Sequence, residues 1–161
     1  MTGTKRMLPG NNEKFFDEEI SVSSGCGEIE EFPLPPESIP QWAAQEAAHW
    51  QRLGEFELLA EAEERTGLTL ELKYADLPSS VWGIHLVRRE RGRIFINTRL
   101  PLLWRRFAIF HELYHLLNDT KGAKFWSHAC VSMESFENRA DLFAWAALWP
   151  EWEENQYCDW N

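Results

Sequence analysis

The sequence predicts an α+β domain in which a small three-stranded sheet packs against helices. Two observations indicate this class. Apolar and polar residues alternate in short runs between residues 68 and 98, and segments with helical spacing of apolar residues lie on both sides. With 161 residues, of which 44% are hydrophobic and 14% aromatic, the chain is long enough for one domain with a substantial core.

Residues 1–39 are expected to form an acidic, poorly ordered tail. The stretch SVSSGCGEIEEFPLPPESIP combines Gly, Ser, Pro and acidic residues and offers few side chains to a core. An alternative is an acidic segment that folds on a partner. The folded domain is expected to span residues 40–150, and residues 151–161 are expected to form a C-terminal tail.

The first helix is predicted from near Pro40 to Gly67. Ser38 suits an N-cap and Pro40 suits a first helical turn. Gly67 suits the position that ends a helix. Gly54 is expected to bend or divide this helix, because glycine weakens a helix interior.

Three strands follow, and two further helices complete the domain. In LTLELKY, residues 68–74, leucines and a tyrosine alternate with polar residues, which is typical of a half-buried strand. The segments VWGIHLV and RIFINT flank the turn RRERG and are predicted to be two more strands. The next helix is predicted from about Pro101 to Asn118, and the last one over residues 132–150.

The segment FAIFHELYHLLND carries the residues with the clearest chemistry. His111 and His115 are four residues apart, so on a helix both imidazoles lie on one face and can bind one ion. Glu112 lies about 100° around the helix from His111, where its carboxylate can accept a proton from an attacking water. HExxH on a helix therefore predicts a Zn²⁺ site with a general base. The alternative is that both rings make only structural hydrogen bonds.

A third protein ligand is expected downstream, and we predict Glu137. Glu137, Ala140, Asp141, Ala144 and Leu148 follow a three–four spacing and form one face of the last helix. Asp141, one turn after Glu137, is predicted to accept the second N–H of a ligating histidine. The alternatives for the third ligand are Glu134 and His128.

The transition state needs a further hydrogen-bond donor beside the metal. Four side chains could supply it, and the sequence does not select among them: Tyr74, His85, Tyr114 and His128. For Tyr114, a packing role is favoured.

Together, FAIFHELYHLLND and ENRADLFAWAALWP resemble the ImmA/IrrE family of metallopeptidases. The resemblance spans roughly residues 40–150 and implies a compact zincin-like fold and a gluzincin-like zinc protease. It implies His111, His115 and Glu137 as ligands and Glu112 as the base. It also implies a substrate of the helix-turn-helix, XRE type: a repressor whose cleavage or inactivation releases genes on mobile elements or in stress responses.

Charge and composition bear on partners and location. The net charge of -10 disfavours direct binding to nucleic acid and favours a basic protein partner or none. No signal peptide or membrane span is recognisable, so a cytoplasmic protein is expected. The rival function is a catalytically weak or inactive zincin-like domain that sequesters a regulatory or toxin/antitoxin-type partner.

Overall fold

The computed structural model describes residue 29 and residues 32–118, 125–131 and 138–158; for residues 125–131 and Asn138 it describes the backbone alone. The described elements, in chain order, are α1 (Gln41–Ala47), the 3-10 helix η2 (Ala48–Trp50), α2 (Glu55–Thr66), β1 (Thr69–Ala75), β2 (Val81–Arg88), β3 (Arg91–Asn97), α3 (Leu102–Asn118), β4 (Phe125–Val131) and α4 (Asn138–Cys158). The α+β class is confirmed.

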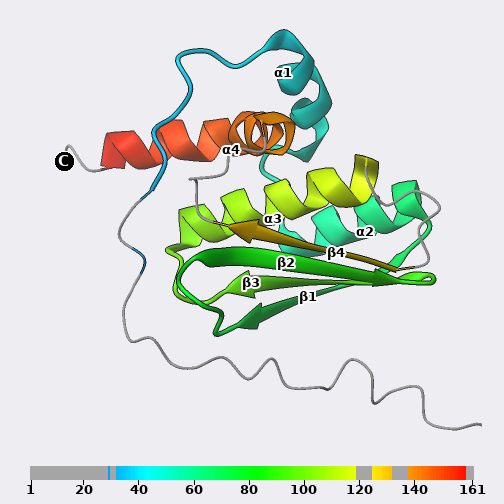
Figure 1. The fold of residues 1–161 in the computed structure, drawn as a ribbon. Helices are drawn as coiled ribbons and strands as arrows, with labels where there is room; N and C mark the ends of the chain where they lie inside the picture. Colours follow the sequence, from blue (N-terminus) through cyan, green and yellow to red (C-terminus); the bar gives the residue numbers. More distant parts are fainter. Residues whose placement is uncertain (1–28, 30–31, 119–124, 132–137, 159–161) are drawn as a thin grey trace, which may run out of the picture.

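The helices of the described chain lie in layers on one side of the sheet (Figure 1). Helix α3 packs on the strands beside α2, α4 packs on α3, and α1 packs on α4. Because α3 is held between the sheet and α4, every residue from Phe107 to Leu116 is buried. A helix in that position is apolar on all sides, and the polar side chains that it does bury need partners.

The sheet is mixed, with the strand order β1-β3-β2-β4. β1 runs parallel to β3, whereas β2 is antiparallel to both β3 and β4. The three predicted strands are confirmed, and β3 pairs with both β1 and β2. β4 was not predicted, because FWSHACV lacks a clear alternation of apolar and polar residues. Pairing with β2 is what makes this segment a strand.

The predicted first helix is two helices. α1 begins after Pro40, and no side chain caps it, so the prediction of Ser38 as N-cap was wrong. Gly54 does divide the segment, since it is the residue that precedes α2. Gly67 ends α2 with φ +72°, a left-handed conformation that glycine adopts without steric cost.

The last helix is longer than predicted. α4 continues through Pro150 to Cys158, so residues 151–158 are helical and not a tail. Pro150 cannot donate a backbone hydrogen bond to the carbonyl of Ala146. The side-chain amide of Gln51 donates to that oxygen instead, at 2.8 Å. A contact between distant parts of the chain thus compensates for the proline.

Packing also begins before the expected boundary at residue 40. The ring of Phe32 stacks on Trp104 with 4.9 Å between centroids and 1° between planes. Ile29 and Ile39 pack on the same core. The domain limits at 40 and 150 remain a prediction, but the packed body includes side chains on both sides of them.

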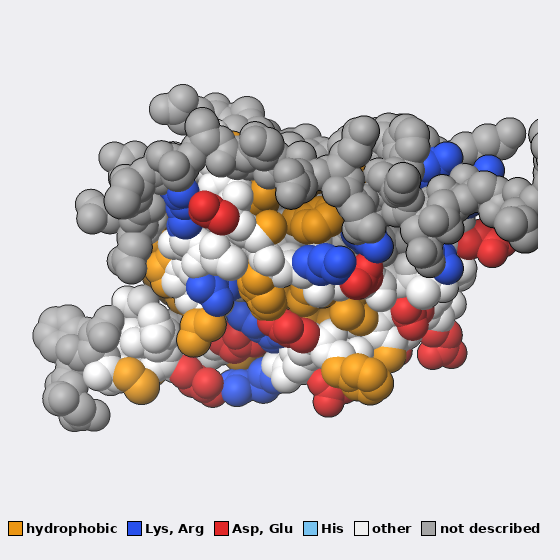
Figure 2. All heavy atoms as spheres, turned by 90° about the horizontal axis from the view of Figure 1, so that it is seen from below, with side chains coloured by type: hydrophobic (Ala, Val, Ile, Leu, Met, Phe, Trp, Pro, Cys, Tyr) orange, Lys and Arg blue, Asp and Glu red, His pale blue; other side chains and the backbone are white. Residues whose placement is uncertain are grey.

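One face of the described chain is mixed in charge. Seen from below, basic and acidic side chains are interspersed around small apolar areas (Figure 2). No helix among the described residues is long and apolar enough to cross a membrane.

Candidate metal centre

The two histidines of HELYH converge in the second half of α3. The Nε2 atoms of His111 and His115 are 3.3 Å apart. Both side chains are buried, with exposed fractions of 3% and 6%. Buried imidazoles with facing nitrogens require a shared partner or a hydrogen bond between the two rings.

The spacing of these nitrogens fits a tetrahedral metal ion. Two ligands that each lie about 2.0–2.1 Å from a tetrahedral zinc are about 3.3–3.4 Å apart. The observed Nε2 separation of 3.3 Å matches that edge. Without a metal, one neutral ring could donate to the other at the same distance. The donor chemistry of the pair is therefore suited to zinc.

Asp141 orients His111 from the neighbouring helix. Its Oδ1 lies 2.8 Å from His111 Nδ1, and both side chains are buried. A carboxylate accepts, so the imidazole donates its Nδ1–H, and Nε2 keeps a lone pair directed towards His115. This is the contact predicted from the sequence. Its role towards a metal stays a prediction.

Glu112 lies on the side of α3 that faces the sheet. Its Oε2 is 2.5 Å from Nδ1 of His85 on β2, and neither side chain is exposed to solvent. The ring of His85 also stacks on that of His115, with centroids 6.0 Å apart. From the sequence, His85 was predicted only as one of four possible hydrogen-bond donors to the transition state. The available signal was that His85 is the one titratable side chain in VWGIHLV.

The third ligand is not identified by the described residues. Glu137 and Glu134 lie outside them. His128 lies on β4 in register with His85, but its side chain is not described. Within the described chain, no group of three His, Cys, Asp or Glu side chains is arranged to hold a metal. Glu137 directly precedes the first residue of α4 and stays our prediction.

The structure places the two candidate tyrosines differently. The Tyr114 hydroxyl accepts a hydrogen bond from Arg139 Nε at 3.1 Å, and its ring lies 5.4 Å from that of Phe143. These contacts connect α3 to α4, as a packing role requires. That hydrogen bond is also the main cause that raises the pKa of Arg139.

The contacts of Tyr74 are with residues other than the histidine pair. Its hydroxyl bonds to Glu55 at the start of α2, and Arg105 lies over its ring at 5.4 Å. Partial burial and the Glu55 carboxylate raise the pKa of Tyr74. The side chain lies on the helix-covered side of β1, as the alternation predicts, but it is 40% exposed. These contacts argue against Tyr74 as a donor at the metal centre.

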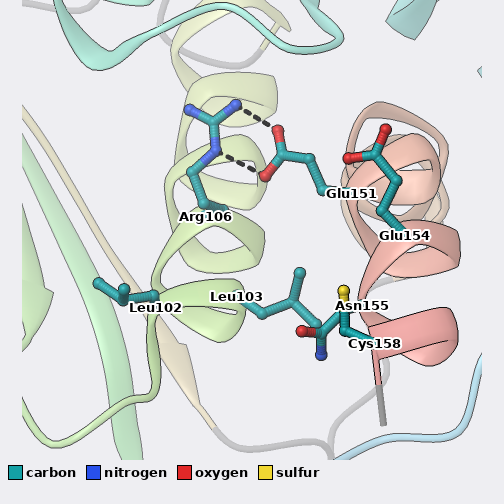
Figure 3. A pocket seen from close by; sticks show the side chains of 7 residues that line it. All are labelled: Leu102, Leu103, Arg106, Glu151, Glu154, Asn155 and Cys158. Carbon is teal, nitrogen blue, oxygen red and sulfur yellow. Dashed lines mark hydrogen bonds and ion pairs between the residues drawn. The ribbon is translucent and has the colours of Figure 1, made fainter. Parts of the chain in front are cut away.

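An open pocket of about 330 Å³ lies between the start of α3 and the end of α4 (Figure 3). Arg106 and Glu151 form a two-bond ion pair along it, with N–O distances of 2.6 and 3.1 Å. None of its lining residues belongs to HELYH. The pocket is therefore separate from the candidate metal centre.

The candidate centre thus lies on a buried His–Glu–His helix between a mixed sheet and a second helix. The family model described as IrrE N-terminal-like domain, Peptidase M78, matches residues 68–156. The chain belongs to this family of metallopeptidases, which confirms the resemblance found in the sequence. Comparison with curated proteins and with solved structures gave no match. The match covers the chain from β1 almost to the end of α4, including both helices that meet at the site.

Proposed function

We propose that the protein is a zinc-dependent endopeptidase. The observation that carries the proposal is the 3.3 Å separation of the His111 and His115 Nε2 atoms, with Asp141 holding the far side of His111. His111, His115 and Glu137 would hold the zinc, and Glu112 would be the general base. Family membership supports a metallopeptidase of this kind.

Each residue would have a defined task in peptide hydrolysis. Bound zinc supplies Lewis acidity, which polarises the scissile carbonyl and acidifies water. Glu112 accepts the proton of the attacking water and passes it to the leaving amine. Asp141 keeps the lone pair of His111 Nε2 directed into the site. The burial of all three side chains strengthens these electrostatic interactions, because the local dielectric is low.

An extended peptide is the substrate form that we propose. β4 is an edge strand of the described sheet and lies next to β2, which carries His85. A substrate segment could add to this edge by backbone hydrogen bonds. Proline at positions flanking the cleaved bond should then block hydrolysis, and unimpaired cleavage of such substrates would argue against strand pairing.

As the physiological substrate we propose a helix-turn-helix repressor of the XRE type. The net charge of -10 favours encounter with a basic DNA-binding protein and disfavours direct contact with phosphates. The family resemblance supports the same class. Incubation with XRE-type repressors from the same genome, followed by mass spectrometry of the fragments, tests this substrate class.

The deciding experiment compares Glu112→Gln, Glu137→Ala and the control Glu134→Ala with the unmodified chain. We expect one zinc per chain in the wild type and in Glu112→Gln and Glu134→Ala, and a sharp loss in Glu137→Ala. Cleavage should vanish in Glu112→Gln. A wild-type chain that lacks zinc would contradict the proposal, and full zinc in Glu137→Ala would move the third ligand to Glu134 or His128.

The second candidate is a binding protein of the same fold that sequesters its partner. The specific observation in its favour is that Glu112 is fully buried and already bonded to His85. Under this function, Glu112→Gln should bind and inactivate the partner as well as the wild type does. Loss of the biological effect in that variant would exclude this candidate.

A further inference from the structure

Strand β2 contacts Glu112 through two residues on one face. His85 and Gly83 are two positions apart, so both are directed to the same side of the sheet. His85 Nδ1 lies 2.5 Å from Glu112 Oε2. An ionised carboxylate has only acceptors, so the imidazole must donate this hydrogen bond. Hydrogen bonds to a charged group are about twice as strong as neutral ones. The bond from His85 therefore fixes the position of Glu112 Oε2.

Gly83 provides the space in which the Glu112 side chain lies. A Cβ added at Gly83 would be 3.2 Å from Glu112 Cγ and 3.4 Å from its Oε1. It would also meet Ile96 Cδ1 at 3.2 Å, so the strand leaves little room for adjustment. The register of β2 shifts between Val81 and Gly83, beside this contact. Such irregularities re-aim side chains next to active sites.

We propose that β2 is a cradle for the general base, in which His85 and Gly83 are positioning residues. This rests on the function proposed above. His85 holds Oε2, and Gly83 lets the rest of the carboxylate lie against the strand. His85 acts through Glu112 and is neither a ligand nor a group that touches substrate.

The cradle predicts a specific pattern of kinetic effects. Replacing His85 with leucine removes the donor and leaves the carboxylate free to rotate away from the attacking water. General-base catalysis contributes about 10²–10⁴-fold, so kcat should fall at least about 10-fold. Substrate binding is untouched, so KM should change by less than about 2-fold. Zinc content should stay at the wild-type level, since His85 is not a ligand.

Three further variants separate positioning from folding. His85→Asn keeps a donor near the Nδ1 position and should restore most of kcat. Gly83→Ala moves the carboxylate without changing His85, and it should lower kcat while zinc is retained. Val87→Ala removes packing at a buried position of the same strand and should keep the wild-type kcat. Zinc loss in His85→Leu, or equal kcat in His85→Leu and the wild type, would overturn the proposal.

A measurement on the metal-free chain tests the contact without catalysis. Thermal unfolding of His85→Leu, Glu112→Gln and the double variant forms a double-mutant cycle. We expect the shifts in Tm to be clearly non-additive, and additive shifts would overturn the cradle. A wild-type chain that cleaves nothing while the cycle is non-additive would instead overturn the proposed function. The two failures are thus distinguishable.

Discussion

Asp141 determines which nitrogen of His111 faces His115. A neutral imidazole carries one proton, and the carboxylate at 2.8 Å holds that proton on Nδ1. Nε2 then has its lone pair directed at the other ring. One residue on α4 thereby controls the donor character of a residue on α3, and its effect on metal affinity can be measured directly.

Replacing Asp141 with alanine should weaken zinc binding about 10–100-fold, because the ring loses its orientation and part of its basicity. Asp141→Asn keeps an acceptor and should have a smaller effect. Competition with a chromophoric chelator measures the affinity. The control is Asp76→Ala, since Asp76 is exposed and pairs with Arg99 at 2.7 Å. Unchanged affinity in Asp141→Ala would show that the contact is only structural.

Tyr74→Phe tests a residue that, unlike Asp141, makes its contacts away from the histidine pair. Because its hydroxyl bonds to Glu55 and not to the histidine pair, kcat and zinc content should match the wild type. The free energy of unfolding should fall by at most about 1 kcal/mol, since the side chain is partly exposed. Urea unfolding and peptidase assays measure the two effects. A loss of kcat greater than about 10-fold would restore Tyr74 as a donor.

At the scale of elements, the junction of α3 and α4 determines whether the site is assembled. The N-terminal half of α4 brings Asp141 to His111. Its C-terminal half is held by the Arg106–Glu151 ion pair beside the pocket of Figure 3 and by the packing of Trp152 on Trp104. The helix reaches these contacts only because it continues past Pro150.

Gln51→Ala should therefore fray the end of α4. Loss of the donor leaves the Ala146 carbonyl without the hydrogen bond that Pro150 cannot make, at a cost of about 1–3 kcal/mol. Amide hydrogen exchange should become faster over residues 151–158, with little change in α3. Gln45→Ala, at an exposed position of α1, is the matched control. Exchange rates equal to those of the wild type would show that water satisfies the carbonyl equally well.

At the scale of the whole molecule, the candidate centre draws on parts of the chain that lie far apart. His85 on β2, the HELYH helix α3 and Asp141 on α4 meet between the layers of Figure 1. A metal bound there would be a link between these layers. Its binding free energy would add to the stability of the folded chain, because the unfolded chain has no such site.

Chelation of zinc should therefore lower the Tm of the wild type. A ligand present at about 1,000 times its Kd stabilises the folded state by about 4 kcal/mol, which is several degrees for a chain of this size. Differential scanning calorimetry with and without chelator measures the shift. His115→Ala lacks a ligand, so its Tm should not depend on chelator. A wild-type Tm that is indifferent to complete zinc removal would contradict a linking role.

The sequence by itself determined the features that depend on short-range geometry. The helical period places His111 and His115 on one face, and the two-residue period located the strands that became β1, β2 and β3. Gly54 and Gly67 marked helix boundaries through their own backbone preferences. The Asp141 contact was also predictable, because helical spacing and a small-residue face indicated how α4 would pack on α3.

Only the tertiary structure decided which distant residues meet. His85 reaches Glu112 across 27 positions of the chain, and Gln51 reaches Ala146 across 95. The strand β4 exists by pairing with β2, and α4 passes Pro150 with the help of another segment. No local period encodes such contacts, because they arise when separate elements compete to bury their surfaces. The helix thus presents the candidate metal-binding pair, whereas the packed layers set the surroundings of Glu112.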